Sequence, residues 1–226
     1  GKRVRTLLIA FQFVISIVLI VFSISIYVQN RYMQRFNMGF KRDNILIQQW
    51  IGSRIASQKD AFADKLKSNP AIVDVTFSSG KIVDLNKSRW GQTYKGELIA
   101  PNIFPVAPNF LSFMGIGITE GRDFIADDNR KSNFTVIFNQ TAQRQYGLTV
   151  GERFGEWDIA GIARDFNFKP LQYGIEPIAF AVFGDHPIAK SWQTGTLYVK
   201  VNPANLSATL KFIRETIQEF DPDAEE

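Results

Sequence analysis

The chain has 226 residues, with 26 Lys or Arg, 22 Asp or Glu, one His and no Cys. The lack of cysteine excludes disulfides, thiolate metal sites and thiol nucleophiles. Residues 1–48 hold seven basic residues and one acidic residue, whereas the rest of the chain holds 19 and 21. The basic excess therefore flanks the N-terminal segment, as expected for contact with anionic lipid headgroups, and the remaining chain lacks the basic stripe typical of nucleic-acid binding.

The first predicted element is a membrane-spanning helix. Residues 6–30 carry no charge, and 16 of the 22 residues in 7–28 are Leu, Ile, Val or Phe. At about 1.5 Å per residue this run covers about 33 Å, enough for a hydrocarbon core of about 30 Å. It is too long for the apolar core of a signal peptide, and no Ala-x-Ala pattern follows it. A buried core helix is the other alternative, but so long an uncharged run is uncommon in a domain of this size.

Basic residues flank this helix on both sides, so charge alone does not orient it. Lys2, Arg3 and Arg5 form a tight cluster directly before it, and a long polar region follows it. Long domains cross a membrane largely regardless of their charge. We therefore expect a cytoplasmic N-terminus and a main domain outside the cytoplasm.

Three of the polar side chains in the apolar run, Gln12, Ser16 and Ser23, form a stripe. Ser16 lies four positions after Gln12, and Ser23 lies seven positions after Ser16. This spacing places all three close to one helical face. Two interpretations stay open. The stripe contacts another membrane helix, or the serines bond the backbone of their own helix.

The region after the membrane segment predicts a β-α-β unit. We expect the helix to continue to about Phe36 and to end at residues 37–39, where Gly39 suits a left-handed cap. The expected elements are then a strand over 44–49, a helix over 58–68 with Ser57 as N-cap and Pro70 after its end, and a strand over 72–77.

Residues 78–95 read as a loop, and the middle of the chain changes to short strands and turns. Strands are expected over 102–106, 116–119, 135–138 and 157–164, and helices over 108–114 and 140–146. The last part predicts strands over 177–183 and 196–201 and an amphipathic helix over 207–220. This order predicts an α+β domain with an inserted, strand-rich middle region.

No motif assigns a catalytic, cofactor-binding or metal-binding residue. His186, the one histidine, lies in Gly-Asp-His-Pro, which is typical of a solvated turn, and no nucleophile elbow accompanies it. Asp127 and Asp128 follow Asp123 but lack the order and the closing Glu of a calcium loop. We interpret them as a solvated acidic turn. The chain contains neither a P-loop nor a G-x-G-x-x-G motif.

Two segments predict turns held by phenylalanine. In residues 119–124 a glycine precedes an ion-pair candidate and Phe124, and in residues 165–168 two phenylalanines follow Asp165 at the end of a strand. We expect these residues to set rigidity rather than to perform chemistry.

The order of several such motifs resembles the FtsX-like permeases of ABC transporters, in the Bacteroidetes-like branch with a MacB-type periplasmic core domain. The matching segments are a basic start with a long apolar helix, then residues 38–46, 106–110, 113–116, 120–124, 136–142, 159–168 and 175–177. Their order and spacing cover nearly the whole chain.

The resemblance implies a membrane helix with basic flanks over 1–36 and a periplasmic core domain over 37–226. Within that domain it implies a porter-like α/β half over 44–82 plus 168–226, and an inserted subdomain over 83–167. It also implies an inner-membrane location with the domain in the periplasm. Further membrane helices normally follow in the family, so we expect this chain to be a fragment.

The resemblance further implies a function without enzymatic activity and without a cofactor. An ABC ATPase subunit, a second permease copy or further membrane helices, the lipid bilayer and a periplasmic or outer-membrane protein are the expected partners. ATP hydrolysis by the ATPase would move the outer domain, for export or mechanotransmission. The alternative is a single-pass receptor or sensor whose outer domain binds a ligand. A membrane-anchored enzyme is a weaker alternative, because no catalytic grouping is recognisable.

Overall fold

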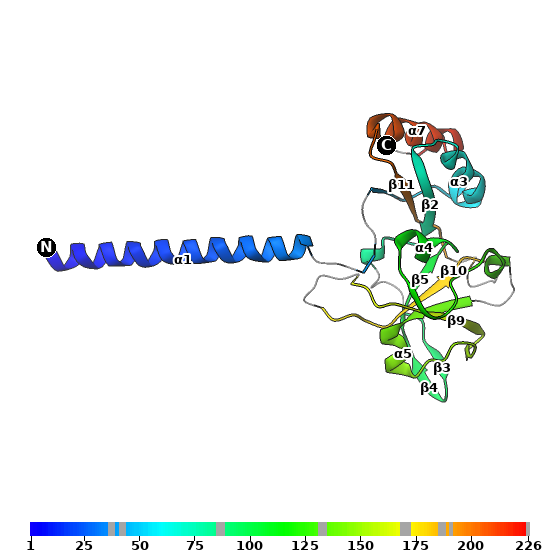
Figure 1. Cartoon of the computed structure of the whole chain (residues 1–226), viewed down its shortest axis with the longest axis horizontal. Helices are drawn as coiled ribbons and strands as arrows, with labels where there is room; N and C mark the ends of the chain where they lie inside the picture. The colour runs from blue at the N-terminus through cyan, green and yellow to red at the C-terminus, as the bar shows by residue number, and fades with distance from the viewer. Residues whose placement is uncertain are drawn as a thin grey trace. The chain divides into compact units, whose positions relative to one another are not determined.

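A computed structural model describes residues 1–35, 39–40, 44–84, 89–130, 135–167, 173–184, 189 and 192–224. The chain forms two compact units, Gly1–Met38 and Gly39–Glu226. The first holds one helix and the second an α/β domain (Figure 1). This mixed architecture confirms the predicted α+β class.

The first unit is the single helix α1, Lys2–Arg35. An 18-residue window within its segment Lys2–Met33 has a mean hydropathy of 2.9, and the segment is long and apolar enough to cross a membrane. The predicted helix end near Phe36 and the turn at Asn37 lie outside the described residues. Within α1, Ser23 Oγ donates a hydrogen bond to Leu19 O at 2.8 Å, which favours the own-backbone interpretation for that serine.

The second unit begins with strand β1 and two short helices before the next strand. The elements of its first part are β1 (Ile45–Gln49), α2 (Ser53–Ser57), α3 (Lys59–Lys67), β2 (Ile72–Ser78), the 3-10 helix η1 (Ile82–Asp84), β3 (Gln92–Tyr94), β4 (Glu97–Ile99), β5 (Asn102–Val106) and α4 (Phe110–Met114).

The second part continues with short strands and closes on a long amphipathic helix. Its elements are β6 (Ile118–Gly121), the 3-10 helix η2 (Ala126–Arg130), β7 (Thr135–Asn139), α5 (Gln140–Tyr146), β8 (Arg153–Phe154), β9 (Trp157–Ala163), β10 (Ile178–Val182), β11 (Thr196–Val201) and α7 (Leu206–Phe220).

One sheet runs through the described part of the second unit, in the strand order β1-β11-β2-β5-β10-β7-β9-β6, with β8 on β9. The contact between β2 and β5 is narrow, because their ladder holds one residue pair, Ser78 with Val106. The neighbouring ladders are longer: six pairs join β11 to β2, and five join β10 to β5. The sheet thus has a three-stranded part and a larger part that meet at β2 and β5.

The three-stranded part is antiparallel throughout, with β11 between β1 and β2. Helices α3 and α7 pack on one of its faces, where Phe62, Leu66, Val199 and Ile213 belong to one buried apolar cluster. Phe62 of α3 meets Phe220 of α7 edge to face, with ring centroids 5.2 Å apart. This packing buries the apolar stripe of each helix, which is the main source of helix stability in a domain of this kind.

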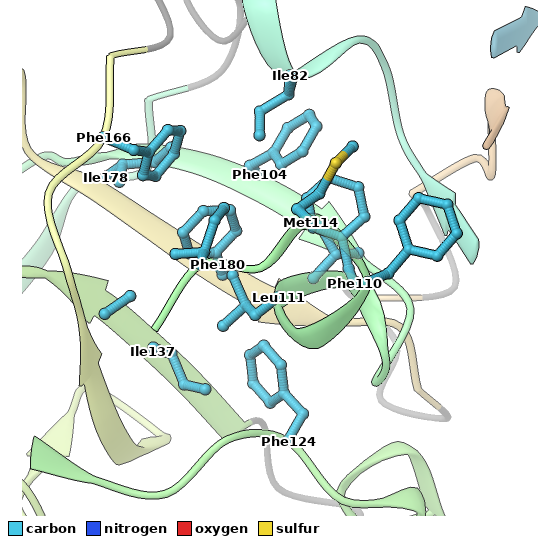
Figure 2. Close-up of a cluster of buried hydrophobic side chains, with 14 of the residues drawn as sticks. Ile82, Phe104, Phe110, Leu111, Met114, Phe124, Ile137, Phe166, Ile178 and Phe180 are labelled. Atoms are coloured by element: carbon cyan, nitrogen blue, oxygen red, sulfur yellow. The ribbon is translucent and has the colours of Figure 1, made fainter. Parts of the chain in front are cut away.

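The larger part of the sheet carries apolar clusters on both faces. Figure 2 shows one of them, in which Phe180 of β10 is surrounded by Phe104 of β5, Phe110 of α4 and Phe166. Phe166 stacks on Phe180 with centroids 5.8 Å apart. The expectation that the segment after β9 is anchored by phenylalanine is confirmed for Phe166; Phe168 lies outside the described residues.

Two local predictions are wrong. Ser57 is the last residue of α2 rather than the N-cap of α3, and its hydroxyl donates to Arg54 O at 2.8 Å. An extra helical turn forms there because Ile55 is fully buried. The predicted loop over 78–95 contains η1 and the strand β3, which pairs with β4 in a hairpin. Since polar residues and glycine dominate this hairpin, its alternation of apolar residues is too weak to read.

The predicted division of the domain into 44–82 plus 168–226 and 83–167 stays a prediction. Strand β10 lies on the porter-like side of that boundary in the sequence, yet it pairs with β5 on one side and β7 on the other. A division at the narrow β2–β5 contact would therefore assign β10 to the inserted part.

Candidate functional site

The described residues contain no group of three or more His, Cys, Asp or Glu that could hold a metal ion. His186 lies outside the described residues. The polar clusters within the described residues each connect a loop to the sheet.

The carboxylate of Asp128 lies in a buried, fully bonded position. Arg122 donates to both of its oxygens at 2.6 and 2.9 Å, Ile125 N donates at 3.0 Å and Thr135 Oγ1 at 3.0 Å. Although burial disfavours its charge, these donors lower the pKa of Asp128 to about 2. The interpretation of Asp128 as part of a solvated turn is wrong, since the bidentate Arg122 compensates the charge inside the fold.

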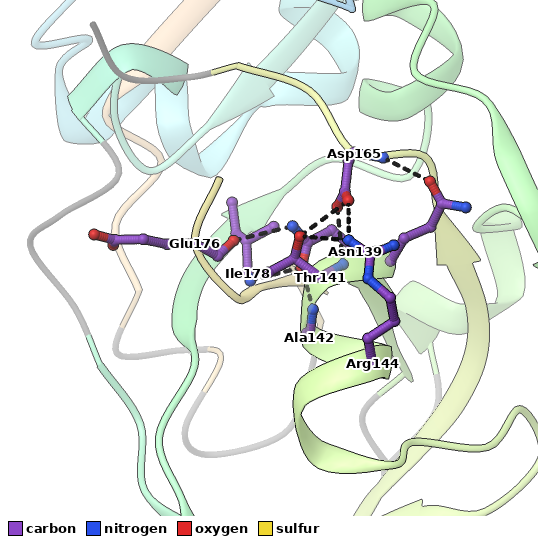
Figure 3. A network of polar contacts seen from close by, with 8 residues as sticks. Asn139, Thr141, Ala142, Arg144, Asp165, Glu176 and Ile178 are labelled. Carbon is purple, nitrogen blue, oxygen red and sulfur yellow. Dashed lines mark hydrogen bonds and ion pairs between the residues drawn. The ribbon is translucent and has the colours of Figure 1, made fainter. Parts of the chain in front are cut away.

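A second network joins the carboxyl end of β7 to the segments that follow β9 and precede β10 (Figure 3). Asn139 Oδ1 accepts from Ala142 N and Ile178 N, both at 3.0 Å, and its amide donates to Glu176 O. Asn139 thus caps α5 and fixes the start of β10 together.

Asp165 completes this network from the far end of β9. Its carboxylate accepts from Thr141 N and Thr141 Oγ1 at 2.9 Å and from Arg144 Nη2 at 2.7 Å. Among the described residues, no buried side-chain nitrogen or oxygen lacks a hydrogen-bond partner. The cluster therefore holds α5 against the sheet.

A groove of about 710 Å³ lies along the other end of the sheet, between β1, α2 and α7. One wall is apolar and consists of Leu210, Ile213 and Ile217 on α7. Trp50, directly after β1, lines the groove while 89 % of its surface stays exposed. An exposed tryptophan beside a row of aliphatic side chains is the kind of surface that a partner segment covers.

Charged residues close one end of the groove. Arg54 forms two ion pairs there: its Nη1 lies 3.7 Å from Asp221 Oδ1, and its Nη2 lies 2.9 Å from Asp223 Oδ2. Gly52 packs against Asp221 so closely that a Cβ there would lie 1.7 Å from its Oδ2 atom. The carboxyl end of α7 is therefore fixed beside the residues that follow β1.

The end of β1 also lines the groove, through Gln48 and Gln49. Among the described strands, β1 pairs with β11 alone. At the two ends of the ladder, Val201 N donates to Asn44 O and Trp50 N donates to Gly195 O. These bonds identify which residue pairs of β1 and β11 are hydrogen-bonded. Since hydrogen-bonded pairs alternate in an antiparallel ladder, the backbone groups of Ile45, Ile47 and Gln49 point away from β11.

Sequence reasoning found none of this groove. Its walls come from the two ends of the second unit, and only the sheet brings them together. Two features of the sequence could have indicated it. Trp50 comes directly after a predicted strand, and Leu210 makes the apolar face of α7 wider than a single packing contact requires.

Comparison with models of protein families identifies the family of this chain. The model of the MacB-like periplasmic core domain matches residues 6–214 of this chain. The chain belongs to this family. The match covers both the apolar helix and nearly all of the second unit, and it confirms the resemblance to FtsX-like ABC transporter permeases.

Solved structures show the same fold. The periplasmic region of MacB from Actinobacillus actinomycetemcomitans is 15 % identical, with a TM-score of 0.57, over 80 % of this chain and 85 % of that one. The extracellular domain of the noncanonic ABC-type transporter YknZ from Gram-positive bacteria is 12 % identical, with a TM-score of 0.54, over 78 % and 94 %. A comparison with curated protein sequences finds no match.

Proposed function

We propose that this chain is part of a permease subunit that carries motion across the inner membrane, from an ATPase on the cytoplasmic side to a domain in the periplasm. The family supports a transporter permease with an extracytoplasmic domain. The coupling to ATP hydrolysis, the export or mechanical work that results, and the pairing with a second permease copy are our proposals.

The length of α1 is the observation that carries this proposal. Its 34 residues extend for about 51 Å, well beyond a hydrocarbon core of about 30 Å. An unbroken helix transmits displacement along its axis because each turn is hydrogen-bonded to the next. Such a helix is suited to moving an outer domain when its cytoplasmic end moves.

The test interrupts the helix where it leaves the membrane. Insertion of Gly-Gly-Ser after Arg35 should preserve the ATPase rate of the assembled complex and abolish ATP-dependent export. Export is measured as the set of molecules that cells release, compared by mass spectrometry with cells whose ATPase is inactive.

The same tripeptide inserted after Gly96 is the matched control. Gly96 has a φ of +88° at the turn between β3 and β4, and a Cβ there would meet no atom within 4 Å. This insertion should leave export intact. Wild-type export from the Arg35 insertion variant would contradict the proposal.

A further inference from the structure

The second unit begins with two residues that pack on the segment after β9. Gly39 has a φ of +85°, and a Cβ there would lie 3.0 Å from Phe166 Cβ and 3.3 Å from Asp165 O. The backbone can come this close because glycine has no side chain. The ring of Phe40 meets the ring of Phe166 edge to face, with centroids 6.0 Å apart, which is a favoured geometry for aromatic pairs. Backbone and side chain thus both attach the start of the unit to this segment.

The segment that receives these two residues is itself fixed to the larger part of the sheet. The carboxylate of Asp165 accepts bonds from Thr141 and Arg144 of α5 (Figure 3). Phe166 is buried and stacks on Phe180 of β10. Phe40 packs against the same apolar cluster. A pull on Phe40 therefore acts on α5 and β10, and not on a loop alone.

The covalent connection from α1 to this contact is short. Helix α1 ends at Arg35, so three residues, 36–38, precede Gly39, and the four peptide steps reach at most about 14 Å. The next described residue bonded to the three-stranded part is Asn44, whose carbonyl accepts from Val201 N. Nine peptide steps from Arg35 to Asn44 would reach at most about 32 Å. A displacement of the helix end is therefore taken up first at the contact with Phe166.

We propose that Gly39 and Phe40 form a fixed joint with Asp165 and Phe166, and that the motion of α1 enters the outer domain at this joint rather than at β1. The larger part of the sheet then receives the displacement directly. The second half of this inference rests on the proposed function, whereas the joint itself can be measured without ATP.

The test measures how firmly the joint holds the domain to α1 in the nucleotide-free permease in lipid nanodiscs. Spin labels are attached after Asn30→Cys in α1 and Leu98→Cys on the β3–β4 hairpin, and labelled chains are diluted with unlabelled ones. Phe40→Ala removes the ring that meets Phe166, so the unanchored link grows from three residues to eight, 36–43. The distribution of distances between the labels should become about 1.6 times as wide, since the extent of an unanchored link grows as the square root of its length.

Two further variants separate the joint from a general loss of stability. Phe220, like Phe40, is partly buried and meets a neighbouring ring edge to face, so Phe220→Ala should lower the melting temperature similarly and leave the distribution unchanged. Phe40→Leu, which keeps an apolar side chain against Phe166, should restore most of the wild-type width. Equal widths for Phe40→Ala and wild type would overturn the inference, and so would equal broadening by Phe220→Ala.

ATP-dependent export tests the second half of the inference. Phe40→Ala should lose most of this export, whereas Phe220→Ala should retain it. A Phe40→Ala variant with a broadened distribution and wild-type export would overturn the claim that motion enters at the joint. Because the distances are measured without nucleotide, they judge the joint separately from the proposed coupling to ATP.

Discussion

Buried polar residues fix the loops of this domain one at a time. Asp128 accepts four hydrogen bonds from three residues and lies within the fold, while Asn139 connects two strands and a helix. A buried charge or amide is tolerated when its bonds are all made, and its removal leaves partners unsatisfied. These residues therefore contribute to the stability and rigidity of the fold.

The charge of Asp128 should make stability depend on pH. Its pKa falls to about 2 in the folded chain, below the ordinary value of 3.8. The ionised form therefore stabilises the fold above about pH 4, and this contribution is lost as the pH falls toward 2. Because Arg122 is partly exposed, the contribution is at most about 2 kcal/mol.

The variant Asp128→Asn tests this contribution by thermal unfolding at several pH values. At pH 7 it should melt about 4–8 °C below wild type, and the difference should shrink steadily between pH 4 and pH 2. A difference that stays constant over this range would contradict the role of the ionised carboxylate.

Gly121, the last residue of β6, should be irreplaceable. Its φ is +71°, and a Cβ there would lie 2.3 Å from Ala160 O. Gly121→Ala should therefore lower the free energy of unfolding by at least about 2 kcal/mol. Nearby Gly117 has open space around it, so Gly117→Ala should change it by less than about 0.5 kcal/mol. Chemical denaturation measures both, and equal effects would contradict the steric argument.

At the scale of elements, most regular strands and helices could be predicted from the sequence, whereas the connections between them could not. The predicted bounds of β5, β11 and α5 agree with the structure, because a proline, glycine or asparagine lies at or next to each end. Helix α2 depends on the burial of Ile55 by tertiary packing, which no local pattern encodes. The groove depends on β1 and α7, which are neighbours in space but lie at opposite ends of the second unit.

Polar residues of α1 should differ in their effect on assembly. The hydroxyl of Ser23 bonds the backbone of its own helix, so Ser23→Ala should leave the permease complex as stable as wild type. An amide such as that of Gln12 gains most from a partner on another helix. Gln12→Leu should therefore weaken association of the reconstituted complex by about 1 kcal/mol, measured by energy transfer between labelled subunits in lipid. Equal affinities of the two variants would count against a helix contact at Gln12.

At the scale of the whole molecule, the uncharged segment is one continuous helix, and the domain after it belongs to the MacB-like family. The sequence motifs were sufficient to identify this family, since their order extends over most of the chain. The substrate and the specific partners have no counterpart in any motif, because contacts with a cargo depend on surface residues that follow no fixed pattern.

The central claim is that nucleotide turnover on the cytoplasmic side moves the outer domain through α1. Since the chain has no cysteine, Asn30→Cys in α1 and Leu98→Cys on the β3–β4 hairpin, where Leu98 is exposed, give one spin-label pair across the two units. In the reconstituted complex, the distribution of distances between the labels should shift between the nucleotide-free and ATP-trapped states. Insertion of Gly-Gly-Ser after Arg35 should abolish that shift.

A distance distribution that is the same in both nucleotide states of the uninterrupted chain, or a shift that survives the insertion, would contradict the account.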